Sequence, residues 1–184
     1  MVRLIIVRHA KTEWNKAGRI QGRSDIPLAS ESIIATKAAS FEYAKYDISA
    51  CYSSPLARAV KTAKLLLGNR NIQVKTDARL IERDFGFYDG KTYEELKMAD
   101  HDKLFYDLSE DPSAETEQAV FDRMKSFLLD MAKLHCGHSV LVVSHGVAIS
   151  FLLYAATHSE FNAQDYKMSY IKNLTATEVV LEDA

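Results

Sequence analysis

The run Val-Arg-Leu-Ile-Ile-Val-Arg-His at positions 2–9 decides the predicted fold of this chain. It is apolar apart from Arg3 until it reaches its last two residues, which is typical of a strand buried on both faces in a parallel sheet. Residues 139–145, Ser-Val-Leu-Val-Val-Ser-His, show a similar pattern far along the chain. We therefore expect two buried strands, each followed by a histidine, His9 and His145.

Weaker β-rich segments and helical patterns alternate around these two strands. Further strands are expected at 47–52, 72–75 and 175–181, and helices at 30–43, from 54, at 116–134 and from 146. Ser54 and Pro55 are predicted to open the second helix, since serine caps helices and proline suits their first position. The alternation predicts an α/β fold with a mainly parallel sheet flanked by helices on both faces.

The composition indicates an ordinary globular enzyme-sized chain. Its 184 residues suit a single domain over 1–184, because single cores usually serve about 100–200 residues. A formal net charge of −2, from 23 basic and 25 acidic residues, excludes a chain built to coat nucleic acid or a membrane surface. We see neither a signal peptide nor a uniformly apolar span, and two cysteines form no disulfide framework, so a cytoplasmic location is expected.

Four separated segments carry residue types suited to phosphate chemistry. They are residues 8–15, 53–63, 80–86 and 144–146. Ligands of open α/β sheets bind beyond the carboxyl ends of the strands, which is where two of these segments lie. The other two follow strands or begin a helix, so we expect all four to meet at one edge of the sheet.

These residues match the requirements of phosphoryl transfer. A neutral imidazole can attack phosphorus and become phosphohistidine, which makes His9 the candidate nucleophile. Fixed donors must hold the phosphoryl oxygens, and arginine offers a planar fork for two of them. The candidates for that role are Arg8, Asn15, Arg58 and His145. Glu82 is the carboxyl candidate for giving the leaving oxygen its proton.

Taken in order, the motifs resemble those of the histidine phosphatase superfamily, also called the phosphoglycerate mutase-like family. Arg8-His9-Ala10 is similar to its Arg-His-Gly/Ala motif, the run from Ser53 to Ala63 to its second motif, and Ser144-His145-Gly146 to its second histidine motif. The segment 28–36 departs from the family pattern, because the usual glycine and glutamine are missing.

The resemblance implies a three-layer sandwich and a metal-independent phosphatase without a cofactor. It implies catalytic roles for Arg8, His9, Arg58, Glu82 and His145. It also implies a substrate-binding set formed by Arg8, Asn15, Gln21, Gly22, Arg58, His145 and Gly146, with no metal ligands. The expected partner is a small phosphorylated metabolite, with no nucleic acid or membrane, and the protein is expected to be a monomer or homodimer.

Two other functions stay open at this point. One is a phosphoglycerate mutase, although mutases of this family are longer and carry more basic residues around the site. The other is a non-catalytic module that binds a phosphorylated ligand. Residues 84–117, an irregular excursion with eleven acidic residues and three lysines, should repel a second anionic group if they cover the site. We therefore expect a phosphomonoester whose remainder is neutral, cationic or aromatic.

Overall fold

A computed structural model describes residues 1–92, 94–96 and 111–182 of the chain. Five strands form one sheet in the order β3-β2-β4-β1-β5. Their bounds are β1 Val2–Arg8, β2 Ile48–Ser53, β3 Val74–Thr76, β4 Ser139–Ser144 and β5 Ala176–Leu181. The first four are parallel to their neighbours and β5 is antiparallel to β1, which confirms the predicted mainly parallel sheet.

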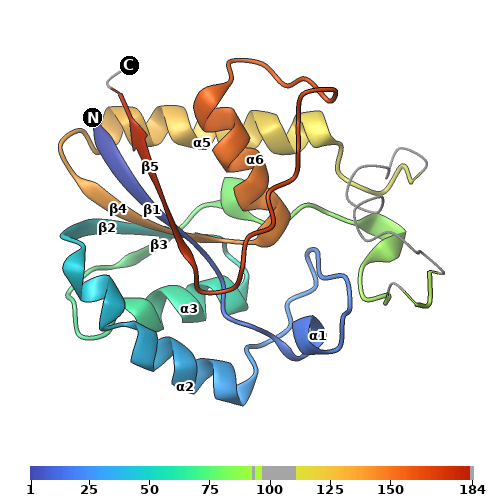
Figure 1. Cartoon of the computed structure of the whole chain (residues 1–184), viewed down its shortest axis with the longest axis horizontal. Coiled ribbons are helices and arrows are strands. Elements are labelled where there is room, and N and C mark those ends of the chain that lie inside the picture. Colours follow the sequence, from blue (N-terminus) through green and yellow to red (C-terminus); the bar gives the residue numbers. More distant parts are fainter. Residues whose placement is uncertain (93, 97–110, 183–184) are drawn as a thin grey trace.

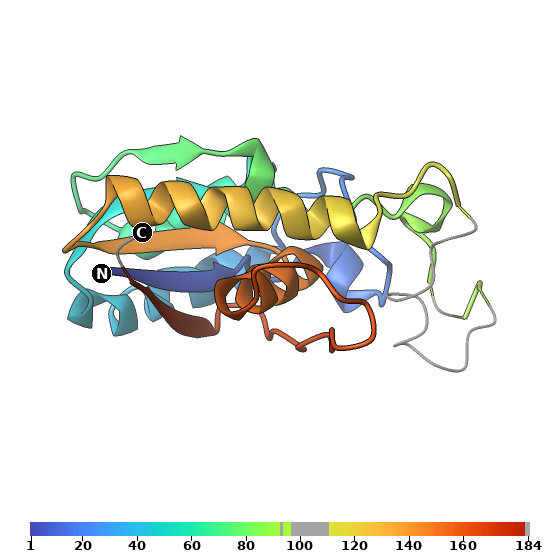
Figure 2. The same ribbon diagram turned by 90° about the horizontal axis from the view of Figure 1, so that it is seen from above.

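Helices cover both faces of this sheet, as Figure 1 shows. On one face lie α2 (Ser30–Ala39) and α3 (Ala57–Leu67), and on the other α5 (Glu117–Leu134) and α6 (Gly146–Thr157). Figure 2 shows α5 running along the direction of the strands. Short helical turns complete the described part: α1 (Glu13–Lys16), η1 (Glu42–Lys45), η2 (Ala78–Leu80) and η3 (Gly86–Tyr88).

The side chains of β1 alternate between two apolar clusters. Leu4 and Ile6 pack with the cluster that contains α5 and α6, whereas Ile5 and Val7 pack with the one that contains α3. All four are fully buried, so this strand is apolar at every one of these positions because each face of the sheet has a helix layer. The continuous apolar run in the sequence therefore reflects burial on both faces of the sheet.

The register of the two central strands places the two histidines side by side. Strand β1 pairs with β4 so that Arg8 lies opposite Ser144, and both strands end there. The N–H of His9 donates to the carbonyl of Ser144 at 2.9 Å. The imidazole rings of His9 and His145 consequently lie with their centroids 5.0 Å apart.

Two local predictions differ from the structure. The helix expected at 30–43 ends at Ala39, and a 3-10 turn follows at Glu42–Lys45. The helix expected from Ser54 begins at Ala57, with Leu56 at its N-cap and no side-chain cap. The Ser54 hydroxyl lies 2.7 Å from Nε2 of His145 and accepts from the N–H of Leu56 at 3.3 Å, ahead of the first helical residue.

Part of the acidic excursion, residues 93 and 97–110, lies outside the described residues. Residues 84–92, 94–96 and 111–117 are described, whereas three of its acidic residues, Asp100, Asp102 and Asp107, fall in the undescribed part, so the predicted repulsion cannot be placed there. In the portion that the structure describes, no helix combines the length and apolar character needed to cross a bilayer.

Candidate active site

His9 lies on the wall of a cavity of about 340 Å³ beyond the carboxyl ends of β1 and β4. Although His9 directly follows a strand at the edge where ligands bind, the residue is only 3% exposed. Its Nδ1 lies 2.7 Å from the carbonyl oxygen of Ala10, which can only accept a hydrogen bond. The proton of a neutral ring is therefore on Nδ1, and Nε2 carries the lone pair that a nucleophile needs.

The surroundings of His9 keep its ring neutral. Burial lowers its pKa well below the usual 6.5, and the positive charges of Arg58 and Arg8 lower it further. A protonated imidazole has no lone pair to attack phosphorus. The same burial and cations therefore maintain the reactive form at neutral pH.

Arg8 reaches the cavity from the end of β1. Its Nη1 donates to the carbonyl of Ile171 at 2.7 Å, whereas its buried Nε finds no partner among the described residues. A buried donor without a partner is costly unless a ligand or water satisfies it. Gly146 gives this guanidinium room, since a Cβ there would lie 3.2 Å from Cζ of Arg8. Both residues line the cavity, in the place predicted for a phosphate group.

Arg58 and His145 lie behind His9 and are not on the cavity wall. Both are fully buried, and Nε of Arg58 donates to Nδ1 of His145 at 3.2 Å. Because Nδ1 accepts, the proton of a neutral His145 is on Nε2, which faces the hydroxyl of Ser54. In this arrangement Nδ1 of His145 has no proton to offer a phosphate oxygen. Burial lowers the pKa of Arg58 to about 10, so the guanidinium stays charged at neutral pH.

Gly22 is also away from the cavity wall, although it was predicted to bind substrate. Its carbonyl accepts from Nη2 of Arg58 at 2.6 Å, and its N–H donates to the Asp89 carboxylate at 2.9 Å. A Cβ at this position would lie 2.9 Å from the Phe85 ring, so the glycine is needed for close packing. In this structure Gly22 holds Arg58 in place.

Glu82 lies on the cavity wall at the amino end of α6 and is 4% exposed. Its Oε1 accepts from the backbone N–H groups of Arg83 and Ala148, both at 2.9 Å. Among the described residues, Oε2 accepts from the N–H of Val147 alone, at 3.2 Å. One lone pair of Oε2 is therefore left for a proton, which is the requirement for the predicted proton donor.

Asn15 and Gln21 both line the cavity. Asn15 caps α1 through its Oδ1, which accepts from the N–H of Thr12 at 3.2 Å. Gln21 accepts the Thr12 hydroxyl proton on Oε1 at 2.7 Å, and its buried Nε2 has no partner among the described residues. Asn15 thus takes part in the capping of α1 and also lines the cavity.

Sequence analysis missed the wall formed by the segment before β5. Met168, Tyr170, Ile171 and Asn173 line the cavity from this side. The segment contains no motif that points to phosphate, and only the fold brings it to the end of β1. On the opposite wall, Lys11 belongs to the first motif but was given no role, and Arg19 was not singled out.

The described residues contain no group of three or more His, Cys, Asp or Glu side chains placed to hold a metal ion. The charged groups that act on the His9 ring are Arg58 and Arg8. A phosphate here would therefore meet guanidinium and backbone N–H donors.

Comparison with protein families decides the assignment, because the model for the histidine phosphatase superfamily (branch 1) matches residues 4–184. The chain belongs to the histidine phosphatase superfamily. It is 36% identical over 153 residues to phosphoserine phosphatase 1 of Hydrogenobacter thermophilus, covering 80% of this chain and 72% of the relative. A probable phosphoglycerate mutase GpmB of Serratia proteamaculans is 31% identical over 158 residues, covering 83% and 74%.

Solved structures show the same fold. Bacillus stearothermophilus YhfR superposes with a TM-score of 0.85 at 26% identity, covering 99% of this chain and 92% of that one. A phosphoserine phosphatase from Entamoeba histolytica, solved in complex with 3-phosphoglyceric acid, gives a TM-score of 0.78 at 31% identity, covering 98% and 91%. The predicted phosphoglycerate mutase-like architecture is thereby confirmed, and this histidine phosphatase is an enzyme of phosphomonoester hydrolysis.

Proposed function

We propose that this histidine phosphatase uses His9 as its nucleophile and Glu82 as its proton donor. The observation that carries the proposal is the hydrogen bond from Nδ1 of His9 to the Ala10 carbonyl at 2.7 Å. Because this bond places the proton of the neutral ring on Nδ1, the lone pair of Nε2 is the reactive position of the His9 ring. The residue lies on the cavity wall.

The proposed reaction has two steps. Nε2 of His9 attacks phosphorus, the bond from phosphorus to the ester oxygen breaks, and the proton of Glu82 passes to that oxygen. A water then attacks the phosphohistidine and gives its proton to Glu82, which releases inorganic phosphate and restores both groups. Arg8 and the amide of Gln21 hold the phosphoryl oxygens through donors that lack protein partners among the described residues.

A direct test follows the phosphoryl group. Brief mixing with a ³²P-labelled substrate and acid-free denaturation should leave a base-stable, acid-labile label on His9. His9→Ala should remove both the label and turnover, while far-UV circular dichroism keeps the wild-type spectrum. Near-normal turnover of this variant, or a label on serine, would refute the mechanism.

We further propose that the substrate is a small phosphorylated hydroxy acid such as phosphoserine. The phosphoserine phosphatases among the relatives support this class. So does Lys11, an exposed residue that lines the cavity and forms no ion pair with any described residue. The nearby acids Glu13 and Glu31 are both paired with Lys16 instead, at 3.0 and 2.6 Å.

This proposal competes with the neutral, cationic or aromatic remainder expected from the acidic excursion. The comparison of phosphoserine with p-nitrophenyl phosphate separates the two. If Lys11 binds the carboxylate, Lys11→Ala should raise KM for phosphoserine about three- to tenfold and leave p-nitrophenyl phosphate unchanged, since exposed ion pairs are weak. Lys133→Ala, on the exposed side of α5, is the matched control. Equal effects on both substrates would remove Lys11 from substrate binding.

The mutase alternative is tested by identifying the product formed from a phosphoglycerate. Several relatives are named probable phosphoglycerate mutases. With 3-phosphoglycerate as substrate, a phosphatase releases inorganic phosphate and a mutase yields the isomeric phosphoglycerate. Nuclear magnetic resonance of ³¹P distinguishes these products. We expect phosphate to be released.

A further inference from the structure

The peptide group that joins His9 to Ala10 is held from both sides by side chains of distant segments. The N–H of Ala10 donates to Oγ1 of Thr62, in the second turn of α3, at 3.0 Å. The carbonyl of His9 accepts from Nδ2 of Asn173, in the segment before β5, at 2.7 Å. The two contacts come from opposite sides of one planar unit, so together they restrict its rotation.

This peptide group controls the orientation of the nucleophile. The torsions on either side of it place Ala10, and the Ala10 carbonyl is the acceptor for Nδ1 of His9. If the peptide turns, that acceptor moves and Nε2 no longer points in a fixed direction. We propose that Thr62 and Asn173 are positioning residues that hold the His9–Ala10 peptide and thereby aim Nε2 into the cavity. This inference rests on the proposed role of His9.

Thr62 is itself fixed for this task. The residue is fully buried, and its hydroxyl proton is donated to the carbonyl of Arg58 at 2.7 Å. With the proton directed there, the lone pairs of Oγ1 are left for the N–H of Ala10. The contact therefore has one orientation, and a valine of the same shape would lose it.

Asn173 is fixed by the backbone around it. The N–H of Leu174 donates to the Arg8 carbonyl at 3.0 Å, and Nη1 of Arg8 donates to the Ile171 carbonyl at 2.7 Å. Leu174 has φ of 61°, in the left-handed region that a non-glycine residue rarely adopts. A strained residue is retained where neighbouring hydrogen bonds outweigh the strain. Here these bonds join residues 171–174 to the end of β1, which carries the nucleophile. The amide orientation is unambiguous, because the His9 carbonyl requires a donor.

The expected effect is on the chemical step and not on substrate affinity. Oγ1 of Thr62 and Nδ2 of Asn173 are engaged with the His9–Ala10 peptide, so their loss should misplace the nucleophile, which lowers the fraction of productive encounters by up to about a hundredfold per ångström. Asn173→Ala and Thr62→Val should therefore each lower kcat for p-nitrophenyl phosphate about tenfold to a hundredfold, with KM changed less than about twofold. Thr62→Ser keeps the hydroxyl and should restore kcat to near the wild-type value.

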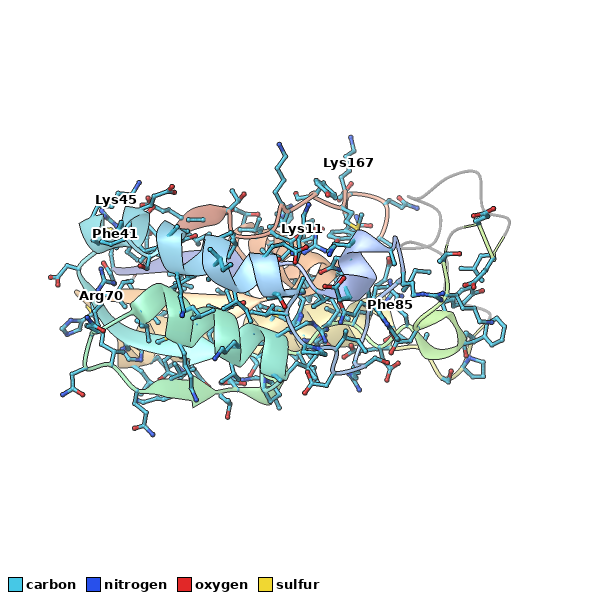
Figure 3. The ribbon with its side chains drawn as sticks, turned by 90° about the horizontal axis from the view of Figure 1, so that it is seen from below. Lys11, Phe41, Lys45, Arg70, Phe85 and Lys167 are labelled. Atoms are coloured by element: carbon cyan, nitrogen blue, oxygen red, sulfur yellow. The ribbon has the colours of Figure 1, made fainter. Side chains whose placement is uncertain are left out.

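Two measurements separate positioning from a general loss of structure. The ¹⁵N resonances of His9 should show exchange between tautomers in Asn173→Ala, because the Ala10 carbonyl is no longer held against Nδ1. The double variant should lose less than the product of the single losses, since both contacts act on one peptide. Asn71→Ala is the matched control, because this asparagine is exposed. It follows Arg70, which Figure 3 shows far from Phe85 and from that side of the molecule.

The outcomes are decisive in either direction. Wild-type kcat in Asn173→Ala, or a failure of Thr62→Ser to exceed Thr62→Val, would overturn the inference. If Thr62→Val does not fold, the half-buried Asn173 carries the test together with the ¹⁵N spectrum. An active His9→Ala would instead refute the proposed function, so the two failures are distinguishable.

Discussion

If His9 is the nucleophile, as we propose, its ring is already in the reactive form before any substrate arrives. Burial and the charges of Arg58 and Arg8 lower its pKa, and the Ala10 carbonyl fixes its tautomer. The pKa of His145 is also lowered well below 6.5, first by burial and then by Arg58. The two rings therefore enter the reaction neutral, and the positive charge that attracts phosphate resides on arginine.

Replacing Glu82 should separate substrates by their leaving groups. Glu82→Gln keeps the shape and accepts backbone N–H groups on its amide oxygen, but it has no proton of suitable acidity to donate. Nitrophenolate leaves without much help from an acid, whereas an alkoxide such as that of serine needs one. We expect kcat for phosphoserine to fall about a hundredfold or more, and kcat for p-nitrophenyl phosphate to fall much less. Equal slowing of both substrates would assign the proton to another group.

Sequence reasoning predicted that His9 and Glu82 would lie at one site, where the structure places them, but not how deeply they are buried; their catalytic roles stay predictions. The two histidines and Glu82 could be singled out as candidates because they stand in segments that resemble the family's motifs. The histidines also directly follow the two buried strands. The burial of Arg58 and the anchoring role of Gly22 could not, since both depend on how residues 22–24 fold over the guanidinium. Asn173 carries no sequence signal, because its contact with His9 exists only after β5 pairs with β1.

At the scale of elements, α5 supports the loop that carries Glu82. Nη1 of Arg123 donates to the carbonyls of Arg79 and Ile81, at 2.5 and 2.7 Å. The same guanidinium binds the Glu115 carboxylate through Nε and Nη2, at 2.9 and 3.0 Å. A helix on one face of the sheet thus fixes the backbone immediately before Glu82, the proposed proton donor.

Arg123→Lys should therefore damage both stability and acid catalysis. A lysine cannot supply the planar fork, so backbone carbonyls next to Glu82 lose their donors. We expect a loss of about 1–3 kcal/mol in the free energy of unfolding, measured with urea, for these part-buried groups. The kcat for phosphoserine should fall more than that for p-nitrophenyl phosphate. Lys133→Ala in the same helix serves as the control, and an unchanged urea midpoint for Arg123→Lys would contradict the expected support.

Elements with a strong pattern were predicted to within a residue or two. The capped helix at 116–134 and the strand at 139–144 appear as α5 and β4 because apolar periodicity and burial agree there. The start of α3 was displaced because tertiary contact outweighed local preference. Ser54 and Pro55 satisfied every local rule for a helix start, yet the serine hydroxyl bonds His145 and Leu56 takes the N-cap.

For the whole molecule, the two buried histidines predict how stability depends on pH. Their pKa values are low in the folded state, whereas the unfolded chain takes up protons near pH 6.5. The unfolded state therefore binds more protons below this pH, and the free energy of unfolding should fall as the pH drops below about 6.5. The slope is up to about 1.4 kcal/mol per pH unit for each histidine, and the stability is fully present above that pH.

Urea denaturation at pH 7.5 and 5.5 measures this dependence. His9→Asn should show a smaller difference between the two pH values than the wild type, because one of the two buried groups is gone. His138→Asn, at an exposed position, should match the wild type. The same pH dependence in all three proteins would contradict the assignment to buried histidines.

Several carboxylates in the described ends of the acidic excursion form hydrogen bonds or ion pairs within the protein. Asp89 accepts from the N–H groups of Gly22 and Ser24, and Asp111 accepts from the N–H groups of Phe87 and Ser113. Glu115 pairs with Arg123. These carboxylates hold loops together at the cavity's side of the fold. The repulsion of a second anionic group stays a prediction, since Asp100, Asp102 and Asp107 lie outside the described residues.

The order of strands in the sheet has a consequence for synthesis of the protein on the ribosome. Strand β1 is the first to be made, yet both of its neighbours, β4 and β5, come from Ser139 onward. The apolar residues of β1 must therefore wait for most of the chain to be translated before either edge is paired. A nascent chain of this kind exposes an unpaired apolar strand for several seconds or more at ordinary translation rates of about 5–20 residues per second. We expect chaperones that shield Val2–Arg8 to raise the yield in the cell, and Asn173 to reach His9 only once β5 has paired with β1.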